Sequence, residues 1–332
     1  MTLRRLLSVV FAGVVSCTVP ELHAQTIATF DVPGAEGTFP QAINRDGQVA
    51  GYYRDNVFQN HGFVRDASGI LVTFDVPGSI NTTPVAIDQD GHITGSYGDS
   101  VADHGFLRQP DGNILLFDAP GSSGTYPRGI SPGGLITGYY YDDFGIHGFL
   151  RAKNGNVIPF DAPGTFPITF PQAINRKGQI AGWNIDQPGA SGRGFVREVD
   201  GTFTRSFDSE TYAVAINAEG EVSGYTGNNA IRGFLSEPDG NEVIFDVVNS
   251  TISATPVAID HSGRVAGWYY DDQTGAVNGF IRKRDGTFVK FSVSPSAETF
   301  PTAMFGSRIT GDYDDENGTH GFVRDSQNTD VH

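Results

Sequence analysis

Short segments in which apolar and polar residues alternate recur along the whole chain, and turns containing glycine separate them. In one stretch, residues 61–65 alternate and residues 70–74 are rich in β-forming side chains, with an Asp-Ala-Ser-Gly turn between them. Residues 85–88 and 92–97 follow in the same way around a Gln-Asp-Gly turn. Glycine supplies the positive φ that such short hairpins require. The pattern therefore predicts four short strands in succession.

This unit repeats with a period of about 43 residues. Its clearest mark is the motif His-Gly-Phe-Leu/Val-Arg, which begins at His61, His104, His147 and His320, with weaker copies beginning at Arg193, Arg232 and Asn278. An Ala-Ile-Asn/Asp phrase and an apolar-x-Gly-aromatic run lie between the copies. A repeat of this length is typical of a β-propeller blade. We therefore predict an all-β fold, a seven-bladed β-propeller of four-stranded blades.

The ends of the chain predict how the propeller closes. The first predicted strand, residues 26–30, begins in the middle of a unit, and the last, residues 320–324, begins a unit that is not completed. The two fragments together make one blade. Because an open array would leave strand edges exposed or need capping repeats, we expect the C-terminal strand to pair with the N-terminal strand and close the ring.

The first 24 residues have the features of an export signal. Two positive charges precede an apolar run at residues 6–15 that is too short to span a bilayer, and Ala24 offers a cleavage point. An alternative is a lipoprotein anchored through Cys17, because the preceding Val-Val-Ser resembles a bacterial lipoprotein box. We expect a secreted or periplasmic protein without a transmembrane segment. The chain then divides into a signal peptide (1–24), a propeller (25–325) and a short disordered tail (326–332).

Composition narrows the range of partners. The net charge of the 332 residues is −16 and no basic run is present, so a nucleic acid is not expected as a partner. Cys17 is the only cysteine, and cleavage after Ala24 would exclude disulfides and cysteine catalysis. No phosphate loop, dinucleotide fingerprint or zinc helix is found, and we expect no cofactor.

The His-Gly-Phe-Leu-Arg, Ala-Ile-Asn and Gly-Tyr-Tyr phrases resemble the HAF-type repeats of bacterial extracellular proteins, which are named for a His-Ala-Phe tripeptide. Glycine replaces that alanine in every copy here. The resemblance covers residues 26–324 and implies an exported repeat protein with propeller-like repeats. It implies no defined reaction and no catalytic residues.

An acid or its amide stands four residues after each glycine of the apolar-x-Gly-aromatic run: Asp55, Asp99, Asp142, Asp186, Asn228, Asp271 and Asp315. Such a ring of carboxylates would suit a cation or sugar hydroxyls. Alternatively, each Asp caps its own loop or bonds the His that follows it. We favour the structural interpretation, because a residue needed once for chemistry need not appear in every blade.

The acidic turns at residues 44–47, 88–91 and 312–318 resemble calcium loops only faintly. A calcium site needs six to eight oxygen ligands, and no later acid completes a cage after the first two turns. The third stretch is rich in acids but has glycine at position seven, where an EF-hand loop has it at position six. We therefore expect hairpin turns there and no metal site.

Strand direction separates the loops into two rims. In an antiparallel meander every second connection lies at the same end, so the short glycine turns share one rim and the longer loops share the other. Aromatic residues and the ring of acids gather near the longer loops, where binding sites are usually found. Trp183 and Trp268 depart from the tyrosine of other units. The predicted binding residues are Trp183, Asp186, Trp268, Asp271, Asp142 and Asp315, and no catalytic residue is predicted.

These observations favour a binding or interaction module over an enzyme. We expect it to act as a monomer on an extracellular ligand, either a carbohydrate or a protein. The alternatives are a propeller enzyme that cleaves an extracellular polysaccharide, as a lyase or a glycosidase, and a structural surface protein without a small ligand.

Overall fold

The computed structural model describes residues 26–227, 231–248, 250 and 254–325. The predicted signal peptide, the predicted tail and Asn228 lie outside these residues. All regular elements of the described part are β-strands. The first half of the chain forms β1 (Thr26–Phe30), β2 (Gly37–Ile43), β3 (Val49–Arg54), β4 (Asn60–Arg65), β5 (Leu71–Phe74), β6 (Asn81–Ile87), β7 (Ile93–Gly98), β8 (Asp103–Arg108), β9 (Ile114–Phe117), β10 (Gly124–Ile130), β11 (Ile136–Tyr141), β12 (Ile146–Arg151), β13 (Val157–Phe160) and β14 (Ile168–Ile174). The second half forms β15 (Ile180–Ile185), β16 (Arg193–Arg197), β17 (Phe203–Ser209), β18 (Thr211–Ile216), β19 (Val222–Thr226), β20 (Arg232–Ser236), β21 (Glu242–Phe245), β22 (Ala254–Ile259), β23 (Val265–Asp271), β24 (Ala276–Arg282), β25 (Phe288–Phe291), β26 (Glu298–Phe305), β27 (Arg308–Asp315) and β28 (Gly318–Asp325).

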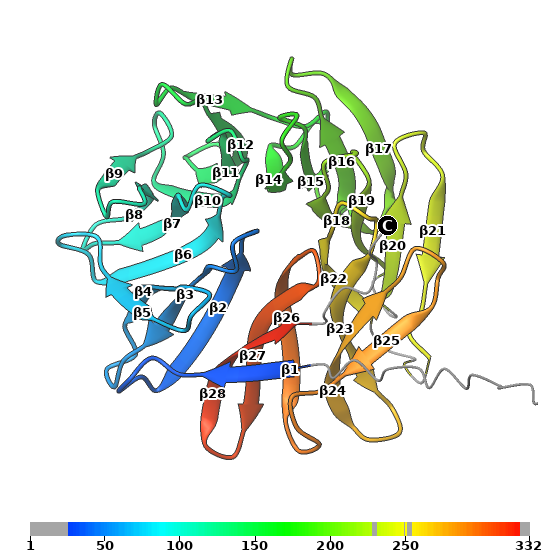
Figure 1. The fold of residues 1–332 in the computed structure, drawn as a ribbon. Helices are drawn as coiled ribbons and strands as arrows, with labels where there is room; N and C mark the ends of the chain where they lie inside the picture. The colour runs from blue at the N-terminus through cyan, green and yellow to red at the C-terminus, as the bar shows by residue number, and fades with distance from the viewer. Residues whose placement is uncertain (1–25, 228–230, 249, 251–253, 326–332) are drawn as a thin grey trace, which may run out of the picture.

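Consecutive strands pair antiparallel in units, which Figure 1 shows arranged around a common centre. The units are β2–β5, β6–β9, β10–β13, β14–β17, β18–β21 and β22–β25, followed by β26–β28 with β1. The first strand of each unit carries the Ala-Ile phrase or its equivalent and contacts the first strand of the next unit, and β26 also contacts β2. The Phe-Asp strand is the outermost strand of each unit. This arrangement is a β-propeller.

The strand β1 completes the last unit. It pairs antiparallel with β28, with Thr26 opposite Asp325 and Phe30 opposite Gly321. The sequence predicts that residues 26–30 pair with residues 320–324, and the structure pairs them with residues 321–325, one residue further along the same strand. The first and last parts of the chain therefore lie side by side, as the blue and red strands of Figure 1 show.

Neighbouring units pack through the phenylalanine of the outermost strand. The Phe30 ring centre lies 6.0 Å from that of Phe63 in the next unit, and the Arg65 guanidinium lies 4.9 Å from the Phe30 ring centre. Phe63 is fully buried. The same three-residue contact recurs at Phe74/Phe106/Arg108, Phe117/Phe149/Arg151, Phe245/Phe280/Arg282 and Phe291/Phe322/Arg324. The Phe and Arg of the repeated motif thus form the core between units.

Two repeated glycines are explained by close approach. Gly62 lies opposite Phe74, and a methyl group at Gly62 would come within 2.7 Å of the Phe74 ring. Gly51 lies opposite Pro40 beside a β-bulge, and a methyl group there would come within 2.3 Å of the Phe39 carbonyl oxygen. A side chain at either position would push strands apart, so the repeat keeps glycine.

The connections form two rims. The short-turn rim carries the hairpin turns at residues 44–48 and 66–70 and their equivalents in other units. The long-loop rim carries the loops at residues 55–59 and 75–80 and their equivalents. Within the described ranges, no helix is long and apolar enough to cross a membrane.

Candidate functional site

Each clear copy of the His-Gly-Phe motif places its histidine between two aspartates on the long-loop rim. His61 Nε2 lies 3.3 Å from Asp55, and its Nδ1 lies 3.0 Å from Asp75. His104, His147 and His320 repeat this with Asp99 and Asp118, Asp142 and Asp161, and Asp315 and Asp31. The Tyr53 ring stacks on His61 with ring centres 5.0 Å apart. These groups bond one another, as expected of a structural element, although His320 Nε2 makes no hydrogen bond among the described residues.

Hydrogen bonds set the charge states of these groups. Backbone N–H donors of the loop, together with the nearby His, lower the pKa of Asp55 and Asp315 below the usual value. Burial alone would lower the pKa of His61 and His320, but hydrogen bonds that the imidazole donates to the neighbouring carboxylates, together with their negative charge, outweigh it and raise the pKa. The charged forms of Asp and His therefore stabilise each other in the folded state.

The acids predicted to contact a ligand are engaged in the same way. Asp142 Oδ1 accepts the backbone N–H of Phe144 at 2.7 Å, and Asp315 Oδ1 accepts that of Asn317 at 2.7 Å. Asp186 pairs with Arg193 at 3.2 Å. Asp271 is 8% exposed, and its Oδ1 accepts the backbone N–H of Gln273 at 2.9 Å. Asp142, Asp271 and Asp315 thus hold their own loops, in line with the structural interpretation, and Asp186 is paired with an arginine.

The two tryptophans pack near the inner strands. The Trp183 ring centre lies 4.3 Å from that of Phe170 and 5.3 Å from that of Tyr212 in the next unit. The Trp268 ring makes an edge contact with Phe300 in the next unit, with centres 6.0 Å apart. Both side chains are half-buried. The structure therefore separates them: Trp183 belongs to a group of rings, whereas Trp268 touches one ring.

That group forms an arc around the centre on the side of the long-loop rim. It comprises Tyr141, Tyr126, Tyr139, Phe170, Trp183, Tyr212 and Tyr225, each within 5.7 Å of the next ring centre. We call these residues the aromatic arc.

Polar groups stand beside the arc. Arg128 Nη2 donates to the Tyr139 hydroxyl at 3.0 Å. The Tyr126 hydroxyl donates to Asp103 at 2.7 Å. Burial and the hydrogen bond to Asp103 raise the pKa of Tyr126. Arg128 and Asp103 are departures from the repeat that sequence reasoning did not single out. Aligning the units by their Ala-Ile phrases would have found Arg128, because Gln41 and Val85 take its place elsewhere.

Asp312 is a second departure that the sequence analysis missed. It lies opposite Phe300 on β27, at the position that Tyr52 and Trp183 occupy in other units. Burial, with repulsion from Asp314, raises the pKa of Asp312 to about 7. A carboxyl group that exchanges its proton near neutral pH is suited to acid–base chemistry.

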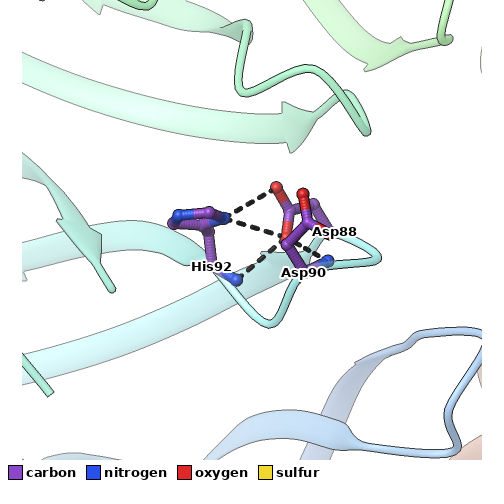
Figure 2. Close-up of side chains that lie close together, drawn as sticks. All are labelled: Asp88, Asp90 and His92. Atoms are coloured by element: carbon purple, nitrogen blue, oxygen red, sulfur yellow. Dashed lines mark hydrogen bonds and ion pairs between the residues drawn. The ribbon is translucent and has the colours of Figure 1, made fainter. Parts of the chain in front are cut away.

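On the short-turn rim, Asp88, Asp90 and His92 bring their ligand atoms within 4.8 Å of one another (Figure 2). Asp88 accepts the backbone N–H of Asp90 at 3.0 Å and that of His92 at 2.9 Å, and its other oxygen lies 3.0 Å from His92 Nδ1. Lys153 lines the same hollow, which disfavours a cation.

Equivalent residues in other units support a structural role for this turn. Asn44 bonds Gln48 at 2.8 Å, Asn175 bonds Gln179 at 2.8 Å and Asp260 bonds Arg264 at 2.7 Å. The residue four positions after the buried Asn or Asp changes from an amide to an imidazole to a guanidinium, while the hydrogen bond between the two side chains is kept. The turn therefore needs a partner for the buried Asn or Asp, and the Asp88–His92 pair supplies it.

Comparisons with known proteins bear on the fold alone. No protein-family model and no curated protein matches the chain. Among solved structures, a streptogramin B lyase is 14% identical over 91% of this chain and 98% of that chain, with a TM-score of 0.62. Virginiamycin B lyase from Staphylococcus aureus is 14% identical over 90% and 99%, with a TM-score of 0.62. The β-propeller domain of the Trilobed protease from Pyrococcus furiosus is 12% identical over 88% and 96%, with a TM-score of 0.63.

The chain is therefore a β-propeller protein. At these identities the likeness extends to the fold and not to an activity, because unrelated functions share this architecture.

Proposed function

We propose that this protein is an exported seven-bladed propeller, closed by β1 on β28, that acts as a monomeric binding module for an extracellular carbohydrate. The signal-like residues 1–24 and the resemblance to HAF-type repeats support export. The pairing of β1 with β28 and the contact of β26 with β2 support closure. The satisfied Asp–His–Asp groups support a scaffold whose repeated polar residues serve structure, which leaves function to the departures from the repeat.

The aromatic arc is the observation that carries the carbohydrate proposal. Aromatic faces stack on the apolar faces of sugar rings, and neighbouring polar groups bond the hydroxyls. Tyr141 is 36% exposed at one end of the arc and Trp183 is half-buried within it. Arg128 and Asp103 supply a donor and an acceptor beside the rings. We assign Trp183 the larger contribution to binding and Trp268 a smaller one.

Alanine variants of the rings test this proposal. Trp183→Ala and Tyr141→Ala should each weaken binding to the best ligand of a glycan array by about tenfold or more, since a stacked ring enclosed by ligand contributes a few kcal/mol. Trp268→Ala should weaken it less. Phe58→Ala is the matched control, because Phe58 is a 74% exposed aromatic on the same rim and outside the arc. If both tryptophan variants lose thermal stability while glycan binding stays unchanged, the rings belong to the core and the site is wrong.

An enzyme that cleaves polysaccharide is the second candidate, and Asp312 favours it. Its pKa of about 7 would let it take or give a proton at neutral pH. Asp312→Asn should then abolish any polysaccharide cleavage by the wild-type protein while leaving glycan binding intact. Cleavage that survives in this variant would remove Asp312 from the reaction.

A further inference from the structure

A cavity of about 610 Å³ opens at the centre of the short-turn rim, opposite the rim that carries the aromatic arc. It lies on the axis of the propeller, because inner strands of six different units line it. Its floor consists of Ile43, Ile87, Ile174, Ile216, Ile259 and Met304, at or next to the ends of those strands. These side chains are 6–9% exposed, while the first residues of the following strands, such as Val49 and Val265, are fully buried. The floor is thus apolar, and its small exposed area faces the cavity.

The mouth of the cavity is polar, and its residues vary from unit to unit. Arg45, Arg176 and His261 each stand one residue after the buried Asn or Asp of the turn, and Gln89, Pro132 and Ala218 take that place in other units. The preceding residue is fixed by a structural role: Asn44 Nδ2, for example, donates to the Asp88 carbonyl at 3.0 Å. The position that follows makes no hydrogen bond that recurs in every unit, although Gln89 uses it to bond the neighbouring turn. It is therefore where the chain can select a ligand without disturbing the fold.

Charge at the mouth favours an anion. The whole chain carries −16, yet two arginines line this cavity, beside the carboxylates of Glu219 and the buried Asp260. Arg45 lies 3.6 Å from Asp46, and Arg176 lies 3.8 Å from Glu219. Because the arginine side chains are 69% and 64% exposed, these pairs contribute little to stability, and either guanidinium can turn to a ligand. The buried Asp260 is neutralised by Arg264 at 2.7 Å and does not oppose an anion.

The mouth is also held in place before any ligand arrives. Gln89 Oε1 accepts the backbone N–H of Arg45 at 2.9 Å, and Arg308 Nη1 donates to the Arg45 carbonyl at 3.1 Å. Across the cavity, Lys177 Nζ donates to the Glu219 carbonyl at 3.1 Å. These bonds connect the turns of neighbouring units. A preformed cavity of this size loses little entropy on binding and falls within the range that encloses small organic ligands.

We infer that this cavity binds a small organic monoanion with an apolar body, of the size of a medium-chain carboxylic acid. The apolar part contacts the isoleucine floor, and the carboxylate accepts hydrogen bonds from the guanidinium groups of Arg45 and Arg176. The site goes beyond the proposed carbohydrate function, because it lies on the opposite rim and uses none of the residues of the aromatic arc. Either site can therefore fail without the other.

Calorimetry with decanoate as the probe tests this inference. The wild-type protein should bind one decanoate per chain and should bind decylamine, which has the same tail and opposite charge, at least tenfold more weakly. The double variant Arg45→Gln/Arg176→Gln should lose at least tenfold in decanoate affinity. Lys153→Gln is the matched control, because Lys153 is a cation on the same rim outside this cavity and its removal should change nothing. Ala218→Trp keeps every charge, fills the cavity and should abolish binding.

Three results would overturn the inference that the cavity binds an organic monoanion. Absence of decanoate binding by the wild-type protein would do so, as would equal affinity for decanoate and decylamine. Equal losses in the arginine variant and in Lys153→Gln would show a general charge effect and no site. The comparison of the two probes uses the wild-type protein alone, so it remains decisive even if a variant fails to fold.

Discussion

The guanidinium of Arg324 lies 4.7 Å from the centre of the Phe291 ring. Arg324 is only 1% exposed, and its Nε and Nη1 atoms have no hydrogen-bond partner among the described residues. Burial lowers the pKa of Arg324. A buried guanidinium without full hydrogen bonding is costly, so the ring beneath it is its main compensation. The contact connects the last unit, which contains β1, to the unit before it.

A double-mutant cycle should detect this compensation. Phe291→Leu should lower the free energy of unfolding more in the wild-type protein than in an Arg324→Met background, with a coupling energy of about 1–2 kcal/mol. The reason is that Phe291→Leu leaves Arg324 buried over an aliphatic side chain, whereas Met has no charge to compensate. Chemical denaturation of the four proteins measures the coupling. Additive effects would show that the pair packs as ordinary apolar surface.

The unit that lacks this arginine supports the same interpretation. Ser236 takes its place, and Arg205 of the preceding unit lies 6.0 Å from the centre of the Phe207 ring instead. Arg205 also donates to the carbonyl groups of Glu237 and Gly220. A cation near the phenylalanine is therefore kept although it comes from a different strand.

Removal of β1 should destabilise the whole propeller. A mature chain that starts at Val32 loses the pairing with β28 and the Phe30 contact with Phe63 and Arg65. The ladder hydrogen bonds alone contribute about 4 kcal/mol at roughly 1 kcal/mol each, so the melting temperature should fall sharply. Deletion of residues 326–332 is the control and should leave the melting temperature unchanged. A truncated protein that melts like the full mature chain would contradict closure by β1.

Stability should be highest between about pH 4 and pH 6.5. His61 and His320 have raised pKa values in the folded state. Their contribution to the free energy of unfolding is therefore complete below the unfolded pKa of about 6.5 and is lost as pH rises through the folded pKa. Asp55 and Asp315 have lowered pKa values in the folded state, so the stabilisation that they contribute is present above about pH 4 and is lost as pH falls through the folded pKa. The melting temperature should therefore decline from pH 6 to pH 8. The double variant His61→Gln/His320→Gln should show a smaller decline, and an identical slope would exclude these residues as the cause.

His92 should be replaceable by glutamine. Gln48 and Gln179 bond the buried Asn of their turns from the same position, so His92→Gln should change the free energy of unfolding by less than about 0.5 kcal/mol. Asp88→Ala is the contrasting variant and should cost about 1–3 kcal/mol, because it leaves two partly buried N–H groups without their acceptor. Melting curves with and without zinc complete the test. A zinc-dependent rise that His92→Gln removes would establish a metal site in place of a turn.

Much of the fold can be predicted from the sequence because the same strand and turn patterns recur in each unit. The alternation predicts the strands, the glycine turns predict the hairpins, and the phase of residues 26–30 against 320–324 predicts which strands pair at the ends. The sequence does not say which strand of a unit is innermost. A unit has the same order of strands along the chain whether its first or its last strand faces the centre of the propeller. The structure places the Ala-Ile strand inside, where it contacts the same strand of the next unit.

The candidate sites are harder to predict, because each collects a few residues from several units. The ring of acids is visible in the sequence because it recurs in every copy of the repeat. A residue that recurs in every unit indicates a structural role and not a ligand site. Arg45 and Arg176 line the same cavity only because the ring brings two turns that are distant in sequence to one mouth. Asp312 and Arg128 are single departures whose neighbours, Phe300 and Tyr139, are known only once the strands are paired. Departures from a repeat, aligned unit by unit, are the signal that sequence reasoning should use.

The most direct test of the proposed function asks whether the protein binds a polysaccharide and leaves it intact. The purified mature protein is incubated with a panel of extracellular polysaccharides, and binding is measured by affinity electrophoresis. Cleavage is measured in the same samples from new reducing ends and from the ultraviolet absorbance of unsaturated sugars. We predict retardation by at least one polysaccharide without new ends, and loss of retardation in Trp183→Ala. New ends that disappear in Asp312→Asn would contradict the account and make the protein an enzyme, and absence of retardation by every polysaccharide would contradict the carbohydrate ligand.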